Sequence, residues 1–409
     1  MSNNTFNVVN FPADTGGCGH YRIMFPIWSV RTIRRDVRFV ESFKLITDQS
    51  FFRDFRMIRV QRQVNDAQAD YLLNFILPIS KAQGQWVSYD IDDCINYADI
   101  PSFNASRSAF NSQKFFDNVK KMLAAVDILT VTTDTLGKYY VDTYGVDPKK
   151  VVVIPNFLPR WWIGETYNPS RQDELWKQNR HKPRIGFPVS SSHFDLKNIN
   201  GGVDDFTHIT DFVRSTVKDY QWVFVGHIPK QLEDLAIDKK VEVVPGSDLL
   251  NYPRELWRRN LQCVVAPLQD NTFNRCKSNI KLLESWALGM PCIAQDLECY
   301  NKYTDTVFKD ANQLANQLDR ILHYRDKYLK HIKENRQIID YGNDVLPNGA
   351  WIEKQLWRWI NLFTLPQKTL TYDLPYLKGQ IEEKIRMRDN PKVSVAQPLK
   401  LETGVSLDL

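Results

Sequence analysis

The sequence predicts an α/β protein in which two βα domains follow one another along the chain. Short apolar runs alternate with helical patterns in both halves, and this alternation favours parallel sheets covered by helices on both faces. It stops at residues 158–183, which are rich in Trp, Arg, Asn and Pro, and then starts again. With 409 residues the chain is long enough for two or three domains of about 100–200 residues each.

The first half contains short runs of apolar, β-branched and aromatic residues that are typical of strands. They lie at residues 6–11, 37–43, 57–60, 86–91, 128–132 and 151–154. Helical periodicity between them is clearest at 67–83 and 114–125. A turn-rich segment, 12–19, follows the first strand and leads into an amphipathic run from Tyr21. We therefore expect a first domain at residues 1–160.

The second half repeats the pattern after residues 158–183, which we interpret as the connection between the domains. Strands are expected at 184–187, 222–225, 241–244, 263–267 and 291–294, and helices at 204–217, 279–288, 311–336 and 350–363. We expect a second domain at 161–345, a helix within 346–365 and a polar tail at 366–409 that is mobile from Asn390. Two successive βα domains predict a ligand cleft between them, at the carboxyl ends of the strands.

Composition and charge exclude several classes of protein. The net charge is only +5, but nine cations against four acids between Arg31 and Arg62 account for all of it. No stretch approaches the roughly 20 apolar residues of a membrane span, and the N-terminus resembles no secretory signal. The six cysteines are dispersed and form no C-x-x-C pair, which indicates reduced thiols and a cytoplasmic protein.

The strongest motif is PLQDNTFNRCKSNIKLLESWALGMPCI, at residues 267–293. A strand leads into a polar loop, and a helix is expected to begin near Lys277 and Ser278. Lys277, Lys281 and Glu284 would then share one helix face. The helix start would offer N–H groups, a hydroxyl and two cations to a diphosphate, and Glu284 could accept hydrogen bonds from a ribose diol. The alternative is a solvated helix with a simple Lys281–Glu284 pair.

This segment resembles the donor-binding motif of the retaining GT-B glycosyltransferases, the superfamily of sucrose and glycogen synthases. In that family an acidic pair lies eight residues apart, and the second acid binds the ribose of the nucleotide sugar. Glu284 matches the second acid, whereas Cys276 stands at the position of the first. Asp270 or Asn274 could substitute for the missing acid. The Lys-Ser sequence before the helix resembles a phage and bacterial branch of the family.

The resemblance covers most of the chain. Residues 126–156 resemble the last βαβ unit of the family's first domain, and RIGFPVSSSHFDLKN, at 184–198, resembles the first βα turn of its second domain. The resemblance implies a GT-B fold, in which two Rossmann-like domains face each other across a cleft and the helix at 350–363 crosses back to the first domain. It also implies a role for Ser191, Ser192 and His193 beside the donor phosphates. The alternative is an ordinary Ser-rich loop.

The glycine-rich loop DTGGCGHYR, at residues 14–22, matches a family loop that approaches the donor pyrophosphate. Glycines permit close backbone approach to a ligand, so Gly17 and Gly19 are candidate donor-binding residues. His20 is a candidate catalytic residue, and Arg22 is a candidate cationic contact for the acceptor. The spacing is not that of the dinucleotide fingerprint, and a tight turn without a ligand is the alternative.

YDIDDC, at residues 89–94, places Asp92 and Asp93 at the end of a strand, where a carboxylate could orient or deprotonate an acceptor hydroxyl. They are the main catalytic candidates. The alternative is that they cap the following segment. An Asp-x-Asp metal site belongs to the other glycosyltransferase fold, and the resemblance implies a UDP-sugar donor with neither a metal nor a further cofactor.

The cationic segment adds Arg31, Arg34 and Arg35 to Arg22 as candidate acceptor-binding residues. Because the family binds its acceptor on the first domain, this cationic segment favours an anionic acceptor. The leading hypothesis is transfer to a hydroxymethylated pyrimidine in double-stranded phage DNA. The alternatives are synthesis of a surface polysaccharide or glycolipid, and a non-catalytic protein that binds sugar nucleotides or nucleic acid.

Overall fold

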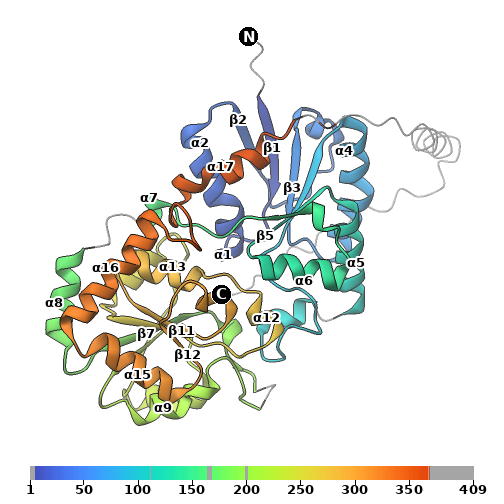
Figure 1. The fold of residues 1–409 in the computed structure, drawn as a ribbon. Coiled ribbons are helices and arrows are strands. Elements are labelled where there is room, and N and C mark those ends of the chain that lie inside the picture. The colour runs from blue at the N-terminus through green and yellow to red at the C-terminus, as the bar shows by residue number, and fades with distance from the viewer. Residues whose placement is uncertain (1–4, 111, 164–167, 199–200, 367, 369–409) are drawn as a thin grey trace, which may run out of the picture. The chain divides into compact units, whose positions relative to one another are not determined.

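The computed structural model describes residues 5–110, 112–163, 168–198, 201–366 and 368. Two parallel sheets of six strands each are found in this part of the chain (Figure 1). The first has the strand order β2-β1-β3-β4-β5-β6 and the second the order β12-β11-β10-β7-β8-β9. Both sheets are therefore wound in two directions from a strand near their middle, which is the doubly wound α/β arrangement.

The strands of the first sheet are β1 (Phe6–Phe11), β2 (Val37–Glu41), β3 (Met57–Gln61), β4 (Trp86–Asp90), β5 (Ile128–Val131) and β6 (Val151–Val153). Its helices are α1 (Gly17–Gly19), α2 (Phe25–Ile33), α3 (Asp66–Asp70), α4 (Leu77–Gln83), α5 (Gln113–Ala125) and α6 (Asp134–Tyr144). Two π-helical segments, His20–Met24 and Tyr71–Ile76, join α1 to α2 and α3 to α4. Shorter 3-10 turns lie at Gln49–Asp54, Ala105–Phe110 and Pro148–Lys150.

The strands of the second sheet are β7 (Arg184–Val189), β8 (Gln221–Gly226), β9 (Glu242–Val244), β10 (Cys263–Ala266), β11 (Cys292–Gln295) and β12 (Val307–Phe308). Its helices are α8 (Pro169–Asn179), α9 (Thr210–Ser215), α10 (Glu233–Ile237), α11 (Tyr252–Arg258), α12 (Thr272–Arg275), α13 (Ile280–Ala287), α14 (Glu298–Asn301), α15 (Ala311–Leu322) and α16 (Arg325–Tyr341). Turns of 3-10 helix lie at Ser191–His193, Thr207–Ile209 and Lys230–Leu232. The remaining helices are α7 (Arg160–Ile163) and α17 (Ile352–Phe363).

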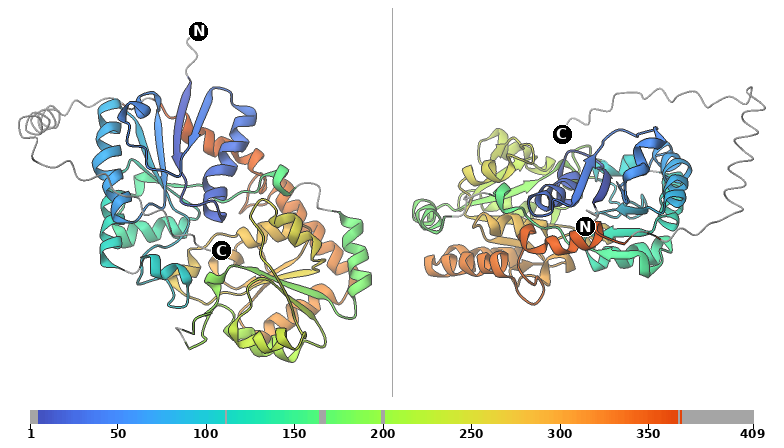
Figure 2. Two further views of the ribbon diagram at one scale, coloured as in Figure 1. Left: turned by 180° about the vertical axis from the view of Figure 1, so that it is seen from behind. Right: turned by 90° about the horizontal axis from the view of Figure 1, so that it is seen from above.

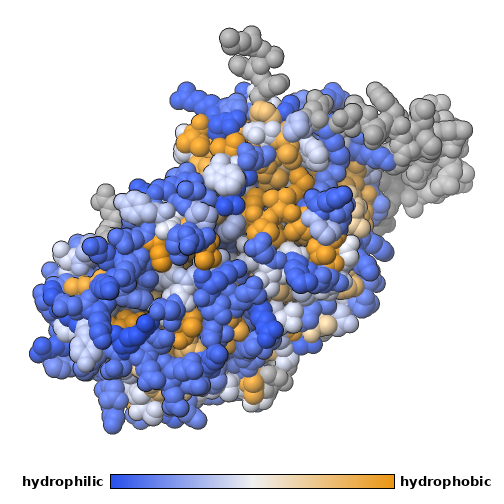
Figure 3. Space-filling view, viewed as in Figure 1, coloured by the Kyte–Doolittle hydropathy of each residue, from blue (hydrophilic) through white to orange (hydrophobic). Residues whose placement is uncertain are grey.

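The apolar runs that predicted strands are the buried strands of the structure. Every residue of β5, β10 and β11 is buried, as expected for parallel strands covered on both faces. The edge strand β6 is less covered, with Val152 38% exposed. Figure 3 shows apolar side chains gathered over the first sheet, whereas the same face over the second sheet is mostly hydrophilic.

Two of the predicted helices are shorter or broken. The helix expected at 204–217 is reduced to a 3-10 turn and α9, because the Asp204 carboxylate accepts hydrogen bonds from the backbone of Phe206 and from the Thr207 hydroxyl and so favours a turn. The helix expected at 311–336 is divided into α15 and α16. The predicted connection, 158–183, contains α7 and α8, which the sequence pattern did not reveal.

The chain from Met1 to Lys368 forms one compact unit that contains both sheets. Helix α17 packs against α2 (Figures 1 and 2). Phe363 at its end contacts Phe39 of β2, with ring centroids 4.9 Å apart. None of the described helices has both the length and the apolar character that a bilayer span requires. The predicted polar tail, including its mobile end from Asn390, lies outside the described residues except for Pro366 and Lys368.

Candidate functional site

The segments predicted to carry function follow strands on either side of the two points where strand order reverses. In the first sheet, where the order reverses between β1 and β3, residues 12–19 follow β1, and Asp92 and Asp93 follow β4, the strand beyond β3. Arg62, which was not predicted as a site residue, follows β3. In the second sheet, residues 190–193 follow β7 and the loop before α13 follows β10. Such reversal points are where open α/β sheets bind their ligands.

The glycine-rich loop is closed by its own aspartate. Asp14 Oδ1 accepts hydrogen bonds from the backbone N–H groups of Gly16 and Gly19, at 2.9 and 3.0 Å, and Arg62 pairs with Asp14 Oδ2 at 2.8 Å. A Cβ atom at Gly19 would lie 1.8 Å from the Asp14 carbonyl oxygen. Gly19 is therefore required by the turn itself, whereas Gly17 is exposed and open to a ligand.

Cys18, Asp92 and Asp93 form a cluster beside this loop. The Cys18 thiol and one carboxylate oxygen from each aspartate lie within 4.8 Å of one another, and these are the residues of the described chain grouped closely enough to hold a metal. Burial raises the pKa of Asp92 to about 6, although Arg62 acts to lower it. A carboxylate with a pKa near neutrality suits proton transfer, and Arg62 supplies positive charge to the cluster.

His20 is buried, which argues against its predicted catalytic role. Only 6% of the residue is exposed, and Nδ1 lies 2.9 Å from the Gly16 carbonyl oxygen. Its ring packs against Phe25 and Trp28, with centroids 5.3 and 5.7 Å away. The π-helical turn at His20–Met24 directs this ring into the aromatic cluster rather than presenting it to solvent.

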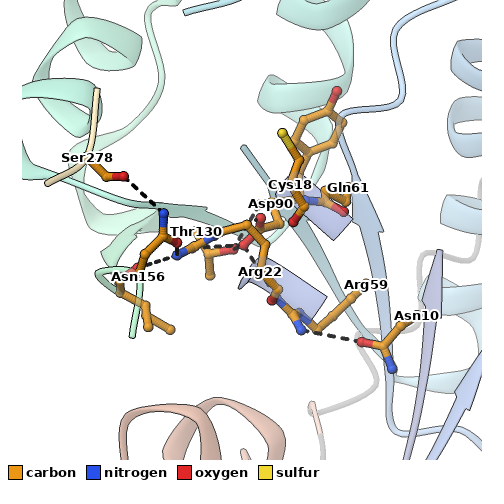
Figure 4. Close-up of polar contacts among 11 residues, drawn as sticks. Asn10, Cys18, Arg22, Arg59, Gln61, Asp90, Thr130, Asn156 and Ser278 are labelled. Atoms are coloured by element: carbon orange, nitrogen blue, oxygen red, sulfur yellow. Dashed lines mark hydrogen bonds and ion pairs between the residues drawn. The ribbon is translucent and has the colours of Figure 1, made fainter. Parts of the chain in front are cut away.

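Arg22 does not have the predicted role of an acceptor contact, because its side chain is fully buried. It forms a two-pronged ion pair with Asp90, at 3.1 and 3.0 Å, in which both side chains are 0% exposed (Figure 4). Arg22 also donates to Asn156 Oδ1, and Asn156 Nδ2 donates to the hydroxyl of Ser278 at 3.1 Å. This network links the first sheet to the loop of the predicted phosphate site. Arg59 donates to the same carboxylate at 3.4 Å.

The remaining predicted acceptor arginines are largely neutralised. Arg31 pairs with Glu41 at 2.9 Å, and Arg34 pairs with Asp36 at 2.6 Å. Arg35 is exposed. The cationic segment of the sequence is thus divided among a buried network, surface ion pairs and single exposed side chains, and it does not form one cationic face.

The second sheet corrects the predicted start of the donor helix. Helix α13 begins at Ile280, after a short turn that follows α12, so Lys277 and Ser278 precede the helix. Lys277 therefore does not share a helix face with Glu284. Its Nζ lies 4.5 Å from the ring centroid of Phe273. Ser278 is held by Asn156, as described above.

Glu284 is the most tightly surrounded of the predicted residues. Only 4% of it is exposed. Tyr21, from the first half of the chain, donates its hydroxyl to Oε1, while Lys281 and Tyr252 donate to Oε2 at 3.2 and 3.4 Å. The Lys281–Glu284 pair of the alternative interpretation exists, but it is not solvated, and it lies where residues of both halves meet.

The charges of this cluster affect one another. Burial and the Glu284 carboxylate raise the pKa of the Tyr21 phenol well above its usual value. Burial acts to lower the pKa of Lys281, but Glu284 and Tyr252 outweigh it, so Lys281 stays charged. Trp162 stacks on Tyr252, with centroids 6.4 Å apart. The cluster is therefore a carboxylate held by two phenols and an ammonium group, with aromatic rings beside it.

His193 is oriented by Asp205, which no sequence motif indicates. Its Nδ1 lies 2.8 Å from Asp205 Oδ2, and Asp205 Oδ1 accepts from the Asn274 amide at 2.7 Å and the Gln269 backbone at 2.9 Å. Burial lowers the pKa of His193, and the nearby charge of Lys277 adds to this effect. Asp205 therefore joins the loop after β7 to the loop after β10.

The other predicted donor residues lie in the same two loops. Ser191 begins the 3-10 turn that includes His193, and the hydroxyl of Ser192 bonds that of Ser190 at 2.7 Å. Asn274 is 1% exposed, and its Oδ1 has no hydrogen-bond partner among the described residues. Cys276, at the position of the missing acid, is buried among apolar side chains.

Of the two residues proposed as substitutes for that acid, Asp270 is engaged elsewhere. Its carboxylate forms a two-pronged pair with Arg275, at 2.6 and 2.9 Å. Asn274, by contrast, is held beside His193 through Asp205. The geometry therefore favours Asn274 over Asp270 as the group next to the predicted phosphate loop.

Four residues of the candidate site were not predicted from the sequence: Tyr21, Arg62, Asp205 and Tyr252. Tyr252 lies in α11 and Asp205 lies before α9, and neither belongs to a recognisable motif. Arg62 has a positive φ of 43°, a backbone conformation that no local sequence pattern predicts. Only their place along the chain could have indicated Arg62 and Tyr21. Arg62 comes just after the predicted strand at 57–60, and Tyr21 comes just after the turn-rich segment 12–19.

The sequence matches no protein-family model, and no curated protein matches it. Solved structures do. A glycosyltransferase from Rickettsia africae ESF-5 matches with a TM-score of 0.55 and 13% identity, over 88% of this chain and 98% of that one. HepE from Anabaena, in complex with UDP-glucose, matches with a TM-score of 0.58 and 10% identity, over 87% of this chain and 99% of that one.

WaaG, a glycosyltransferase involved in lipopolysaccharide biosynthesis, gives a TM-score of 0.54 and 12% identity, over 88% of this chain and 100% of that one. At such identities the likeness speaks for the fold. It agrees with the two doubly wound sheets and with the reversal points at which the candidate residues gather. The chain therefore has the GT-B fold that its sequence predicts.

Proposed function

We propose that this protein is a glycosyltransferase that moves a sugar from a nucleotide-sugar donor, a UDP-sugar, to an acceptor hydroxyl. The observation that carries the proposal is the position of Glu284. Its buried carboxylate is held by hydroxyl groups and an ammonium group where the two halves of the chain meet. A ribose diol presents hydroxyl groups of the same kind, and the structural likeness to HepE with UDP-glucose supports a UDP-sugar.

In this proposal the ribose replaces the Tyr21 hydroxyl at Glu284. Lys277 and Lys281 then lie on the side of the diphosphate. As the glycosidic bond breaks, negative charge grows on the leaving diphosphate, and fixed cations stabilise that charge more strongly in the transition state than in the ground state. His193, which Asp205 orients through its Nδ1 atom, places its imidazole ring beside the predicted phosphate loop.

We assign Asp92 the role of orienting and deprotonating the acceptor hydroxyl. Its raised pKa, its position after β4 and the charge of Arg62 beside it suit that task. Asp93 lies in the same cluster and shares the assignment. The sequence resemblance implies retention of anomeric configuration, so in this proposal the acceptor hydroxyl held by Asp92 attacks the face of the sugar from which UDP leaves, and NMR of the product's anomeric proton tests it.

A transfer assay tests the function. The full chain is incubated with a panel of UDP-sugars, and release of UDP is measured with and without added acceptors. We expect turnover with at least one UDP-sugar, and a loss of about 100-fold or more in kcat/KM for Glu284→Gln and Lys277→Ala. The control is Glu233→Gln, which changes an exposed acid on α10. Turnover that survives Glu284→Gln unchanged would contradict the proposal, and absence of turnover with retained UDP binding would favour the binding-only alternative.

For the acceptor, the structure turns the preference away from DNA and toward a glycan or glycolipid. The DNA hypothesis rested in part on the arginine segment, but Arg59 is buried and Arg31, Arg34 and Arg62 are in ion pairs. Four of the nine cations in this segment are thus buried or paired, so fewer charges are available to displace counterions from phosphates than the sequence suggests.

We therefore expect no measurable affinity for duplex DNA, with or without hydroxymethylated pyrimidines. Fluorescence anisotropy of a labelled duplex at about 50 mM salt, where phosphate contacts are strongest, is the measurement. An affinity that weakens steeply as salt is raised would restore the DNA acceptor.

A further inference from the structure

A cavity of about 500 Å³ lies between two segments from different halves of the chain. Its volume falls within the range of about 300–1,000 Å³ that is usual for small-molecule sites. The residues that line it come from 102–108 and from 191–197. We propose that this cavity binds the acceptor through a phosphate ester whose organic part is apolar. The inference rests on the proposed function and names the acceptor class.

The cavity occupies the place where a second substrate would meet the first. Residues 102–108 follow β4, and residues 191–197 follow β7, so both segments extend from carboxyl ends of strands. Ser191 is the one predicted donor-binding residue in the lining. His193, two residues further, belongs to the Asp205 cluster near Lys277. The cavity therefore adjoins the predicted phosphate loop without overlapping the Glu284 cluster.

The charge of the cavity favours an anion. Arg107 lines it from the first half and Lys197 from the second, and none of the described residues that line it is acidic. Neither cation forms an ion pair with an acid of the described chain. Two cations that line the cavity from different segments suit a phosphate group, which can accept hydrogen bonds from both.

The walls favour an apolar body attached to that anion. Leu196 is the apolar side chain that the lining leaves accessible, at 36% exposed, while Phe103 and Phe194, at 4% and 2% exposed, are already packed beneath the surface of the cavity. A free phosphate or an unsubstituted sugar phosphate would leave Leu196 in contact with water. Burial of an apolar group against it adds favourable free energy in proportion to the area covered.

Isothermal titration of the full chain tests the inference with three probes: n-octyl phosphate below its micelle-forming concentration, octyl β-D-glucoside and glucose 6-phosphate. The first carries both features, and each of the others carries one. We expect n-octyl phosphate to bind about tenfold more tightly than either of the others. Arg107→Gln and Lys197→Gln should each weaken its binding about tenfold, as expected for loss of a charged hydrogen bond.

The control is Lys218→Gln, an exposed lysine in the turn before β8, at the amino end of the second sheet. It should leave n-octyl phosphate binding unchanged, and thermal unfolding of each variant checks that it is folded. Equal binding of octyl β-D-glucoside, or equal effects of all three substitutions, would overturn the inference.

Titration of the same variants with UDP separates this inference from the proposed function. If UDP binds and n-octyl phosphate does not, the inference fails and the proposed function stands. If n-octyl phosphate binds as expected and UDP does not, the cavity is an anion site, but its role as an acceptor site falls with the proposed function.

Discussion

The protonation state of Asp92 is expected to control how the proposed transfer reaction depends on pH. The Asp92 carboxylate lies beside Cys18 and Asp93, and the guanidinium of Arg62 is the largest of the influences that lower its pKa. Burial raises the pKa of Asp92 to about 6, and Arg62 keeps it from rising further. Only the deprotonated carboxylate accepts a proton from an acceptor hydroxyl.

We therefore predict that kcat/KM falls as the pH is lowered through about 6, the pKa of Asp92. In Arg62→Gln the acidic limb should move to higher pH, because removal of the cation destabilises the carboxylate and raises its pKa. Asp92→Asn should remove most of the activity at every pH. The measurement is the pH profile of kcat/KM.

Arg53→Gln is the matched control for Arg62→Gln, since Arg53 is an exposed arginine in the same half of the chain. Its acidic limb should coincide with that of the unmodified protein. An acidic limb that stays in place in Arg62→Gln would remove Asp92 from the proposed role.

Helix α17 shows how one element contributes to the site without supplying a ligand contact. Trp359 lies over the guanidinium groups of Arg22 and Arg59, at 5.4 and 5.2 Å from its ring centroid, and is 1% exposed. It thereby covers the buried network that connects Asp90 to the loop of Ser278. The helix closes one side of the first sheet and keeps water from two buried cations.

We predict that Trp359→Ala lowers the free energy of unfolding by about 3–5 kcal/mol, because it opens a large cavity and exposes the cations. Trp357→Ala should change it by less than about 0.5 kcal/mol, since Trp357 is on the same helix but 48% exposed. Urea unfolding followed by circular dichroism measures both. Equal losses in the two variants would contradict this account of α17.

At the scale of the whole molecule, the sequence was sufficient for the fold and partly sufficient for the site. Buried parallel strands are short apolar runs, so eleven of the twelve described strands could be predicted from local composition. The exception is β12, which has only two residues, Val307 and Phe308. Competition between side-chain and helical backbone hydrogen bonds was harder to predict. Asp204 accepts a hydrogen bond from the backbone of Phe206, and this favours a turn where the sequence pattern predicted the start of a helix. The start of α13 was misplaced for a similar reason, because α12 and its following turn lie in the loop that looked like a helix start.

The contacts that define the candidate site are remote in sequence. Tyr21 and Glu284 are 263 positions apart, and Asn156 and Ser278 are 122 apart. The sequence motif predicts a ligand-binding role for Glu284, but only the tertiary structure shows which groups surround its carboxylate. The same holds for Arg22, whose exposed, ligand-binding role was a reasonable expectation until Asp90, 68 positions away, was found beside it.

The most direct test of the central claim compares UDP with its 2′,3′-dideoxy analogue by calorimetric titration, in the unmodified protein and in Glu284→Gln. If Glu284 holds the ribose diol, the unmodified protein should prefer UDP by roughly 10–100-fold, the effect of one charged hydrogen bond. Glu284→Gln should lose most of that preference while it still binds both ligands weakly through the diphosphate. Equal affinity of the unmodified protein for the two nucleotides would contradict the account.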